Sequence, residues 1–80
     1  MDEILEKILC DVKEKFIKIA NDKGNFHSIH EALGHLEEER MELLQSIIEN
    51  NIENIKLECD DVIISMIGLR LLLDGEKYVL

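Results

Sequence analysis

The sequence contains no proline and no tryptophan, and its aromatic residues are two phenylalanines and one tyrosine. Charged residues are instead interspersed with leucine and isoleucine, a composition that favours helix over sheet. The length of 80 residues suggests one domain, covering 1–80, and a chain this short buries a small fraction of its surface when it folds alone. We therefore expect an all-α protein, a three-helix chain forming an antiparallel bundle that oligomerisation completes.

Basic residues are scarce, with nine lysines and arginines against eighteen aspartates and glutamates. The resulting net charge of −9 opposes binding to nucleic acid phosphates and to anionic membrane surfaces. A cation or a basic partner fits this charge better.

Long apolar runs are also missing. The amino-terminal stretch MDEILEKILCDVKEKF has acidic residues near its start and no uninterrupted apolar core, so it does not resemble a secretory signal. The longest apolar run is too short and too interrupted to span a bilayer. We expect a cytoplasmic protein in which Cys10 and Cys59, far apart in helical patterns, are reduced and buried rather than paired or bound to zinc.

Apolar residues recur at three- and four-residue intervals from Ile4 to Ala20, which predicts a first amphipathic helix ending near Gly24. A second helix is predicted from Ser28, which has the spacing of a capping box with Glu31, to about Asn50. A third follows a cap at Asn51 and stops at Asp74-Gly75. The second and third helices form a predicted hairpin over about 28–73.

Carboxylates interrupt the apolar stripes of this hairpin. At about 100° per residue, Glu39 shares the side of the second helix that carries His35 and Leu43, and Glu42 lies at its border. In the third helix, Glu58 and Asp61 share a side with other residues that we expect to face inward: Val62, Ser65, Leu69 and Leu72. Each helix thus carries an inward acid pair with i, i+3 spacing.

Four carboxylates in a partly dry site would repel one another, and a divalent cation would remove that repulsion. Mg²⁺ and Mn²⁺ prefer such oxygen ligands. The alternative is a solvated acidic face, which we expect for the outward residues Glu37, Glu38 and Asp60. Because the inward pairs lie on successive helices of a hairpin, the metal site is the preferred interpretation.

The segments EEERMELLQSI and LECDDVII resemble the E-x-x-E and E-x-x-D motifs of the MazG-like all-α nucleoside triphosphate pyrophosphohydrolases. Fifteen residues separate Glu42 from Glu58, and the preceding FHSIHEALGHL is similar to the start of this helix in small phage and bacterial members. The resemblance extends from about Phe26 to Asp74. It implies that Glu39, Glu42, Glu58 and Asp61 bind Mg²⁺, with Mn²⁺ as an alternative, and that a nucleoside triphosphate is cleaved to monophosphate and pyrophosphate.

Sequence alone leaves several roles open. Glu39 and Glu42 are both candidates for the catalytic base. His35 is a candidate for hydrogen bonding to a ligand carboxylate or to substrate, although a packed histidine is the simpler interpretation. Larger relatives commonly supply basic residues near the end of the following helix, where this chain offers Lys77 and then Arg70, which are equally consistent with surface charges. A role in base stacking would fall to Phe26, Phe16 or Tyr78, although a place in the core is the simpler interpretation for either phenylalanine.

The third helix is apolar on the side opposite its acids as well, where Ile63, Ile64, Ile67 and Leu71 lie. A helix of this kind is normally covered on both sides, so we expect a homodimer or homotetramer, as the family resemblance also implies. The alternative function is a non-catalytic helical interaction or regulatory protein that uses its apolar surface to bind a partner. A relative that binds nucleotide without hydrolysing it lies between these two hypotheses.

Overall fold

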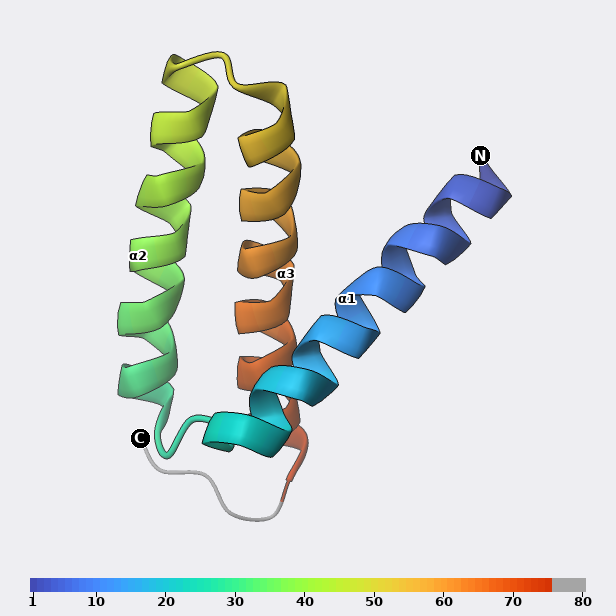
Figure 1. Cartoon of the computed structure of the whole chain (residues 1–80). Helices are drawn as coiled ribbons and strands as arrows, with labels where there is room; N and C mark the ends of the chain where they lie inside the picture. Colours follow the sequence, from blue (N-terminus) through green and yellow to red (C-terminus); the bar gives the residue numbers. More distant parts are fainter. Residues whose placement is uncertain (76–80) are drawn as a thin grey trace.

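The computed structural model describes residues 1–75, which form three helices: α1 (Asp2–Lys23), α2 (Ile29–Ile48) and α3 (Ile52–Asp74) (Figure 1). The prediction of an all-α chain with three helices is confirmed. Lys77 and Tyr78, which the sequence suggested for phosphate contact and base stacking, lie outside the described residues.

The helix boundaries follow the predicted caps. Gly24 ends α1 with φ 76°, a left-handed conformation that glycine adopts without strain. The Ser28 side chain accepts a hydrogen bond from the Glu31 backbone N–H at 3.1 Å, and the Asn51 side chain accepts one from Asn54 N–H at 3.2 Å. At the other end of α3, Gly75 has φ −74°, so the helix stops at the predicted residue without a left-handed cap.

Helices α2 and α3 form an antiparallel hairpin, and they lie side by side over their whole length (Figure 1). Four residues of the predicted inward stripes are buried, namely Ala32, Ser46, Ser65 and Leu72, and so is Gly68. Ile64, which we predicted on the opposite side of α3, is buried as well. The predicted inward faces of the hairpin are therefore confirmed.

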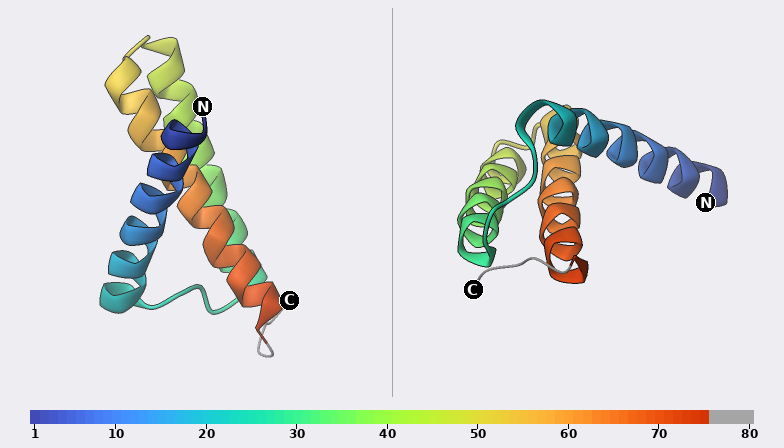
Figure 2. Two further views of the ribbon diagram at one scale, coloured as in Figure 1. Left: turned by 90° about the vertical axis from the view of Figure 1, so that its right-hand side faces the viewer. Right: turned by 90° about the horizontal axis from the view of Figure 1, so that it is seen from below.

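Helix α1 packs against α3 through its carboxy-terminal half, whereas its amino-terminal half projects away from the hairpin (Figure 2). Val12 is the one residue of α1 that is buried. Four apolar side chains of the projecting half are exposed: Ile4, Leu5, Ile8 and Leu9. The outer side of α3 is also incompletely covered, since Ile64 is buried but Leu71 is 50% exposed. The single chain thus leaves apolar surface uncovered on both helices.

The prediction that both cysteines are buried is wrong. Cys10 and Cys59 are free thiols, as expected, but both are exposed. Cys10 belongs to the first half of α1, which has few neighbours in the chain. The helical pattern placed Cys59 among apolar residues, but the single chain does not cover those residues.

Among the described residues, none of the helices is long and apolar enough to cross a membrane.

Candidate metal centre and adjoining cavity

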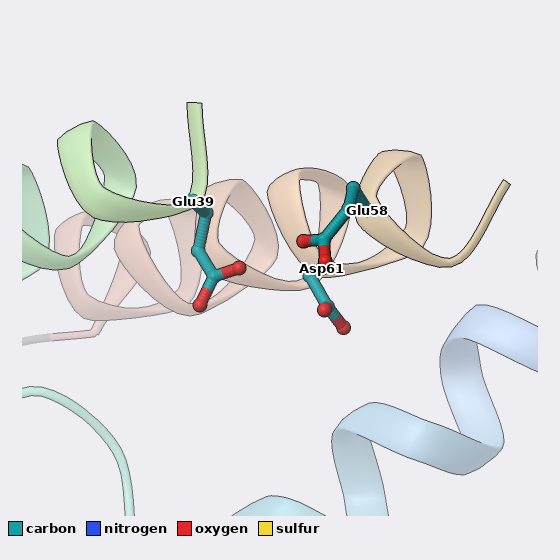
Figure 3. A group of neighbouring side chains, drawn as sticks. All are labelled: Glu39, Glu58 and Asp61. Atoms are coloured by element: carbon teal, nitrogen blue, oxygen red, sulfur yellow. The ribbon is translucent and has the colours of Figure 1, made fainter. Parts of the chain in front are cut away.

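Three carboxylates from the hairpin converge between α2 and α3. Glu39 extends from α2, while Glu58 and Asp61 extend from successive turns of α3 (Figure 3). One oxygen of each lies within 4.8 Å of the others. The helical period explains the α3 pair, and the antiparallel packing of the hairpin brings Glu39 opposite to it. Three of the four residues predicted to bind metal therefore lie together.

Glu42, the fourth predicted ligand, is an exposed residue one turn after Glu39 on α2. It is not one of the three carboxylates that converge within 4.8 Å. Its negative charge nevertheless contributes to raising the pKa of both Glu39 and Glu58. The structure thus places Glu42 beside the group of three, and its roles as ligand and base stay predictions.

The Glu39 carboxylate is the most strongly perturbed group of the site. Its side chain is only 14% exposed, and its Oε2 atom is buried without a hydrogen-bond partner among the described residues. Burial raises the pKa of Glu39 to about 7, and the negative charges of Glu42 and Asp61 add to that effect. In the metal-free protein this carboxylic acid therefore exchanges its proton near neutral pH.

The two α3 acids share this environment. Burial raises the pKa of Glu58, with further repulsion from Glu42 and Asp61, and Glu58 Oε2 is also buried without a partner among the described residues. Burial also raises the pKa of Asp61, although the positive charge of Lys15 partly opposes the rise. Carboxylate oxygens that lack donors and repel one another are the arrangement that a hard divalent cation would stabilise.

Lys15 is a neighbour of the site that the sequence pattern did not indicate. Its Nζ donates a hydrogen bond of 2.8 Å to Asp60 Oδ2, and this bond raises the pKa of Lys15. The Asp60 side chain is only 23% exposed, and its bond to Lys15 joins α3 to α1. The prediction that Asp60 is a solvated, outward-facing acid is therefore wrong. The helical periodicity of α3 alone could not indicate that α1 lies beside Asp60.

Glu37 and Glu38 are exposed, as predicted, and Arg40 donates a hydrogen bond to Glu37.

His35 lies one turn before Glu39, with Nε2 3.4 Å from Glu39 Oε1. Its ring is also packed beside that of Phe26, with 5.5 Å between the ring centroids. His35 is exposed, with 45% of its side chain accessible, and it contacts both Phe26 and the carboxylate cluster. Its role in binding a ligand or substrate stays a prediction. Arg70 instead donates to Asp74 at 2.8 Å on the exposed side of α3, which supports its interpretation as a surface charge.

A cavity of about 490 Å³ adjoins the carboxylates. It is bounded by the last turns of α1, by the linker 24–27 and by the facing sides of α2 and α3. Glu39 and Asp61 belong to its lining, and Phe16, Phe26 and Ile64 supply apolar wall. Its volume lies in the range of small-molecule sites, about 300–1,000 Å³. The sequence did not predict it, because it depends on how α1 and the linker pack against the hairpin.

No protein-family model, no curated protein and no solved structure matches the chain. The likeness to MazG-like enzymes therefore stays a prediction that rests on the two short motifs and on their spacing. What the described residues establish is an all-α protein of three helices with a cluster of three partly buried acids.

Proposed function

We propose that this protein is a metal-dependent nucleoside triphosphate pyrophosphohydrolase, which cleaves a ribo- or deoxyribonucleoside triphosphate to the monophosphate and pyrophosphate. The observation that carries the proposal is the convergence of Glu39, Glu58 and Asp61 within 4.8 Å, from two antiparallel helices, at the side of a cavity. The acidic motifs with their family resemblance give the class of reaction, and the cavity offers space for the rest of the substrate.

In this proposal the three carboxylates hold Mg²⁺ or Mn²⁺, and exposed Glu42 completes the ligand set. The bound cation would neutralise charge on the phosphate oxygens and lower the pKa of a coordinated water. Glu39 or Glu42 accepts a proton from the attacking water. Addition of that water across the α–β phosphoanhydride bond leaves one phosphate on the nucleoside and releases pyrophosphate, so one water is consumed for each bond broken.

The test is a screen for pyrophosphate release from ribo- and deoxyribonucleoside triphosphates, with Mg²⁺ or Mn²⁺ and with EDTA as the metal-free control. Ion-exchange chromatography and phosphorus NMR identify the products. We expect monophosphate and pyrophosphate in the presence of metal and no turnover with EDTA. Orthophosphate with diphosphate would refute the proposed bond cleavage, and absence of turnover despite metal binding would refute the enzyme.

A non-catalytic helical interaction protein is the second candidate, and one specific observation favours it. The first half of α1 projects from the hairpin (Figure 2), and a stripe of four apolar side chains on it is 42–67% exposed: Ile4, Leu5, Ile8 and Leu9. Such a stripe suits helix-in-groove recognition of a partner. This candidate predicts that the carboxylates have no role in function, so equal behaviour of the wild type and of Asp61→Asn in every nucleotide and metal assay would favour it.

A further inference from the structure

Among residues 1–75, two hydrogen bonds hold α1 and the linker that follows it against α3. Lys15 Nζ, in the second half of α1, donates a hydrogen bond of 2.8 Å to Asp60 Oδ2. Asn25 Nδ2, just after the end of α1, donates one of 3.0 Å to the backbone carbonyl of Gly68. The linker lies so close to α3 that a methyl group on Gly68 would be 2.8 Å from Asn25 Oδ1. Loss of the Lys15 bond alone would therefore leave α1 attached at its carboxy-terminal end.

The apolar contact of α1 with α3 is limited. Val12 is the one buried residue of α1, and the residues before it project from the hairpin (Figure 2). No other lysine or arginine of residues 1–75 forms an ion pair with Asp60. Elements that few buried contacts hold are the ones that open most readily in a folded protein. The bond between Lys15 and Asp60 is thus one of few interactions that keep α1 against α3.

The positive charge of Lys15 also acts on the acidic cluster. Asp61, which follows Asp60, is one of the three converging carboxylates. Burial raises the pKa of Asp61, and the charge of Lys15 opposes that rise. The hydrogen bond to Asp60 raises the pKa of Lys15, and the negative charge of Asp61 adds to that effect. A cation held by Glu39, Glu58 and Asp61 would therefore be close enough to the Lys15 ammonium group to be repelled by it.

We propose that Lys15 and the divalent cation compete for the negative charge of the α3 acids, so that a bound cation loosens α1 from α3 and a packed α1 weakens cation binding. The inference rests on the proposed function for the presence of the cation. Lys15 does not bind the cation but acts through its charge, and Asp60 is the positioning residue that holds this charge beside Asp61. Such a coupling is reciprocal, so one factor describes both effects.

Mn²⁺ titration of the whole protein, followed by electron paramagnetic resonance, tests the effect on affinity. We expect Lys15→Met to bind Mn²⁺ about three- to tenfold more tightly than wild type, because a positive charge beside the cation is lost. Asp60→Asn should bind Mn²⁺ more weakly by a similar factor, because it removes a negative charge and leaves that of Lys15. Both variants lose the same hydrogen bond, so a purely structural role would shift both affinities in one direction. Equal affinities, or shifts of the same sign, would overturn the inference.

Three further variants separate the charge of Lys15 from its shape and from general acidity. Lys15→Arg keeps the charge and should bind Mn²⁺ as wild type does. Lys18→Met and Glu37→Gln make the same charge changes at exposed positions, so their affinities should stay within about twofold of wild type. Tighter binding by Lys15→Arg, or a change in Lys18→Met as large as that in Lys15→Met, would overturn the inference.

Amide hydrogen exchange, followed by NMR, measures the effect on α1. When Mg²⁺ replaces EDTA, amides of residues 12–20 should exchange about three- to tenfold faster through local opening, by the same factor that describes the affinities. Amides of the hairpin should exchange more slowly, because the cation stabilises it. In Lys15→Met, Mg²⁺ should not accelerate exchange in α1. Unchanged or slower exchange of α1 with Mg²⁺ in wild type would overturn the inference.

The same measurements distinguish this inference from the proposed function. Mn²⁺ binding and pyrophosphate release by wild type, with no difference between Lys15→Met and Asp60→Asn, would overturn the competition alone. Affinity shifts of opposite sign without turnover of any triphosphate would support the competition and overturn the hydrolase. Absence of Mn²⁺ binding by wild type would overturn both.

Discussion

Lys15 of α1 and Asp60 of α3 are joined by a hydrogen bond of 2.8 Å, next to the acidic cluster on α3. Helix α1 makes its contacts within the chain with α3, so this bond fixes α1 close to the site. The same positive charge lowers the pKa of Asp61, opposing the effect of burial. Lys15 thus connects the position of α1 with the charge of the cluster.

We expect Lys15→Met to lower the free energy of unfolding by about 1 kcal/mol, because the pair is only partly shielded from water. Urea unfolding of Lys15→Met, Asp60→Asn and the double variant would give the coupling energy of the pair. Lys18→Met, which changes an exposed lysine of the same helix, is the control. A coupling energy of zero would show that the bond does not contribute to the packing of α1.

The stability of the metal-free protein should fall as pH rises. Glu39 has a pKa of about 7 in the fold against an ordinary value of 4.5, so between these pH values the folded chain holds a proton that the unfolded chain has lost. Stability from this group is therefore complete below about pH 4.5 and is lost as pH passes 7. The raised pKa values of Glu58 and Asp61 act in the same direction.

We expect the free energy of unfolding in EDTA to drop by on the order of 2–3 kcal/mol between pH 5 and pH 7.5. Urea denaturation at both pH values measures it. Glu39→Gln should remove most of the drop and stabilise the protein at pH 7.5. Stability that stays constant or increases over this range in wild type would contradict the buried, repelling arrangement of the acids.

Metal should reverse that loss at neutral pH. Mg²⁺ or Mn²⁺ bound only to the folded chain would raise stability by about 2.7 kcal/mol at a hundredfold excess over the dissociation constant. Thermal unfolding with metal and with EDTA measures the effect. Glu58→Gln and Asp61→Asn should abolish the metal-dependent rise, although either change relieves repulsion and stabilises the metal-free protein. Glu37→Gln, an exposed acid on the same hairpin, should respond to metal as wild type does.

The sequence predicted the local parts of this structure well. The caps at Gly24, Ser28 and Asn51 depend on interactions within a few residues, and each lies where its pattern indicated. The convergence of Glu39 with Glu58 and Asp61 could also be predicted, because helical period and a short connection bring these faces together. Short-range geometry was sufficient for both.

What the sequence did not predict depends on the packing of α1. The Lys15–Asp60 bond, the cavity and the Asn25–Gly68 contact all require the crossing position of α1 and its linker, which no periodic pattern specifies. The cysteines were misjudged for a related reason. The apolar residues of a helix indicate which side packs against other elements, but they do not indicate whether those elements belong to the same chain or to another copy.

The uncovered stripe on α1 predicts self-association. Leu5 is 49% exposed in the single chain, so Leu5→Glu should cost the isolated fold little, but it would place an unpaired charge in an apolar contact between copies. Sedimentation equilibrium at micromolar concentration should show a dimer or tetramer for wild type and a shift toward monomer for Leu5→Glu. Asn21→Glu makes the same charge change at an exposed polar position of α1 and should leave the assembly unchanged. A folded wild-type monomer would contradict the prediction.

Loss of one carboxylate from the cluster should reduce pyrophosphate release far more than loss of an exposed acid. If Glu39 and Asp61 act on the attacking water and the phosphates through the metal that they hold, Glu39→Gln and Asp61→Asn should each lower kcat by about two to three orders of magnitude. Glu37→Gln and Glu38→Gln remove the same charge from exposed positions on α2, so their effect should stay within about twofold, which is the scale of screened surface charge. Initial rates at saturating metal, measured by pyrophosphate release, give the comparison, with circular dichroism to establish that each variant is folded. Equal rates for all variants would show that the converging carboxylates do not carry the reaction.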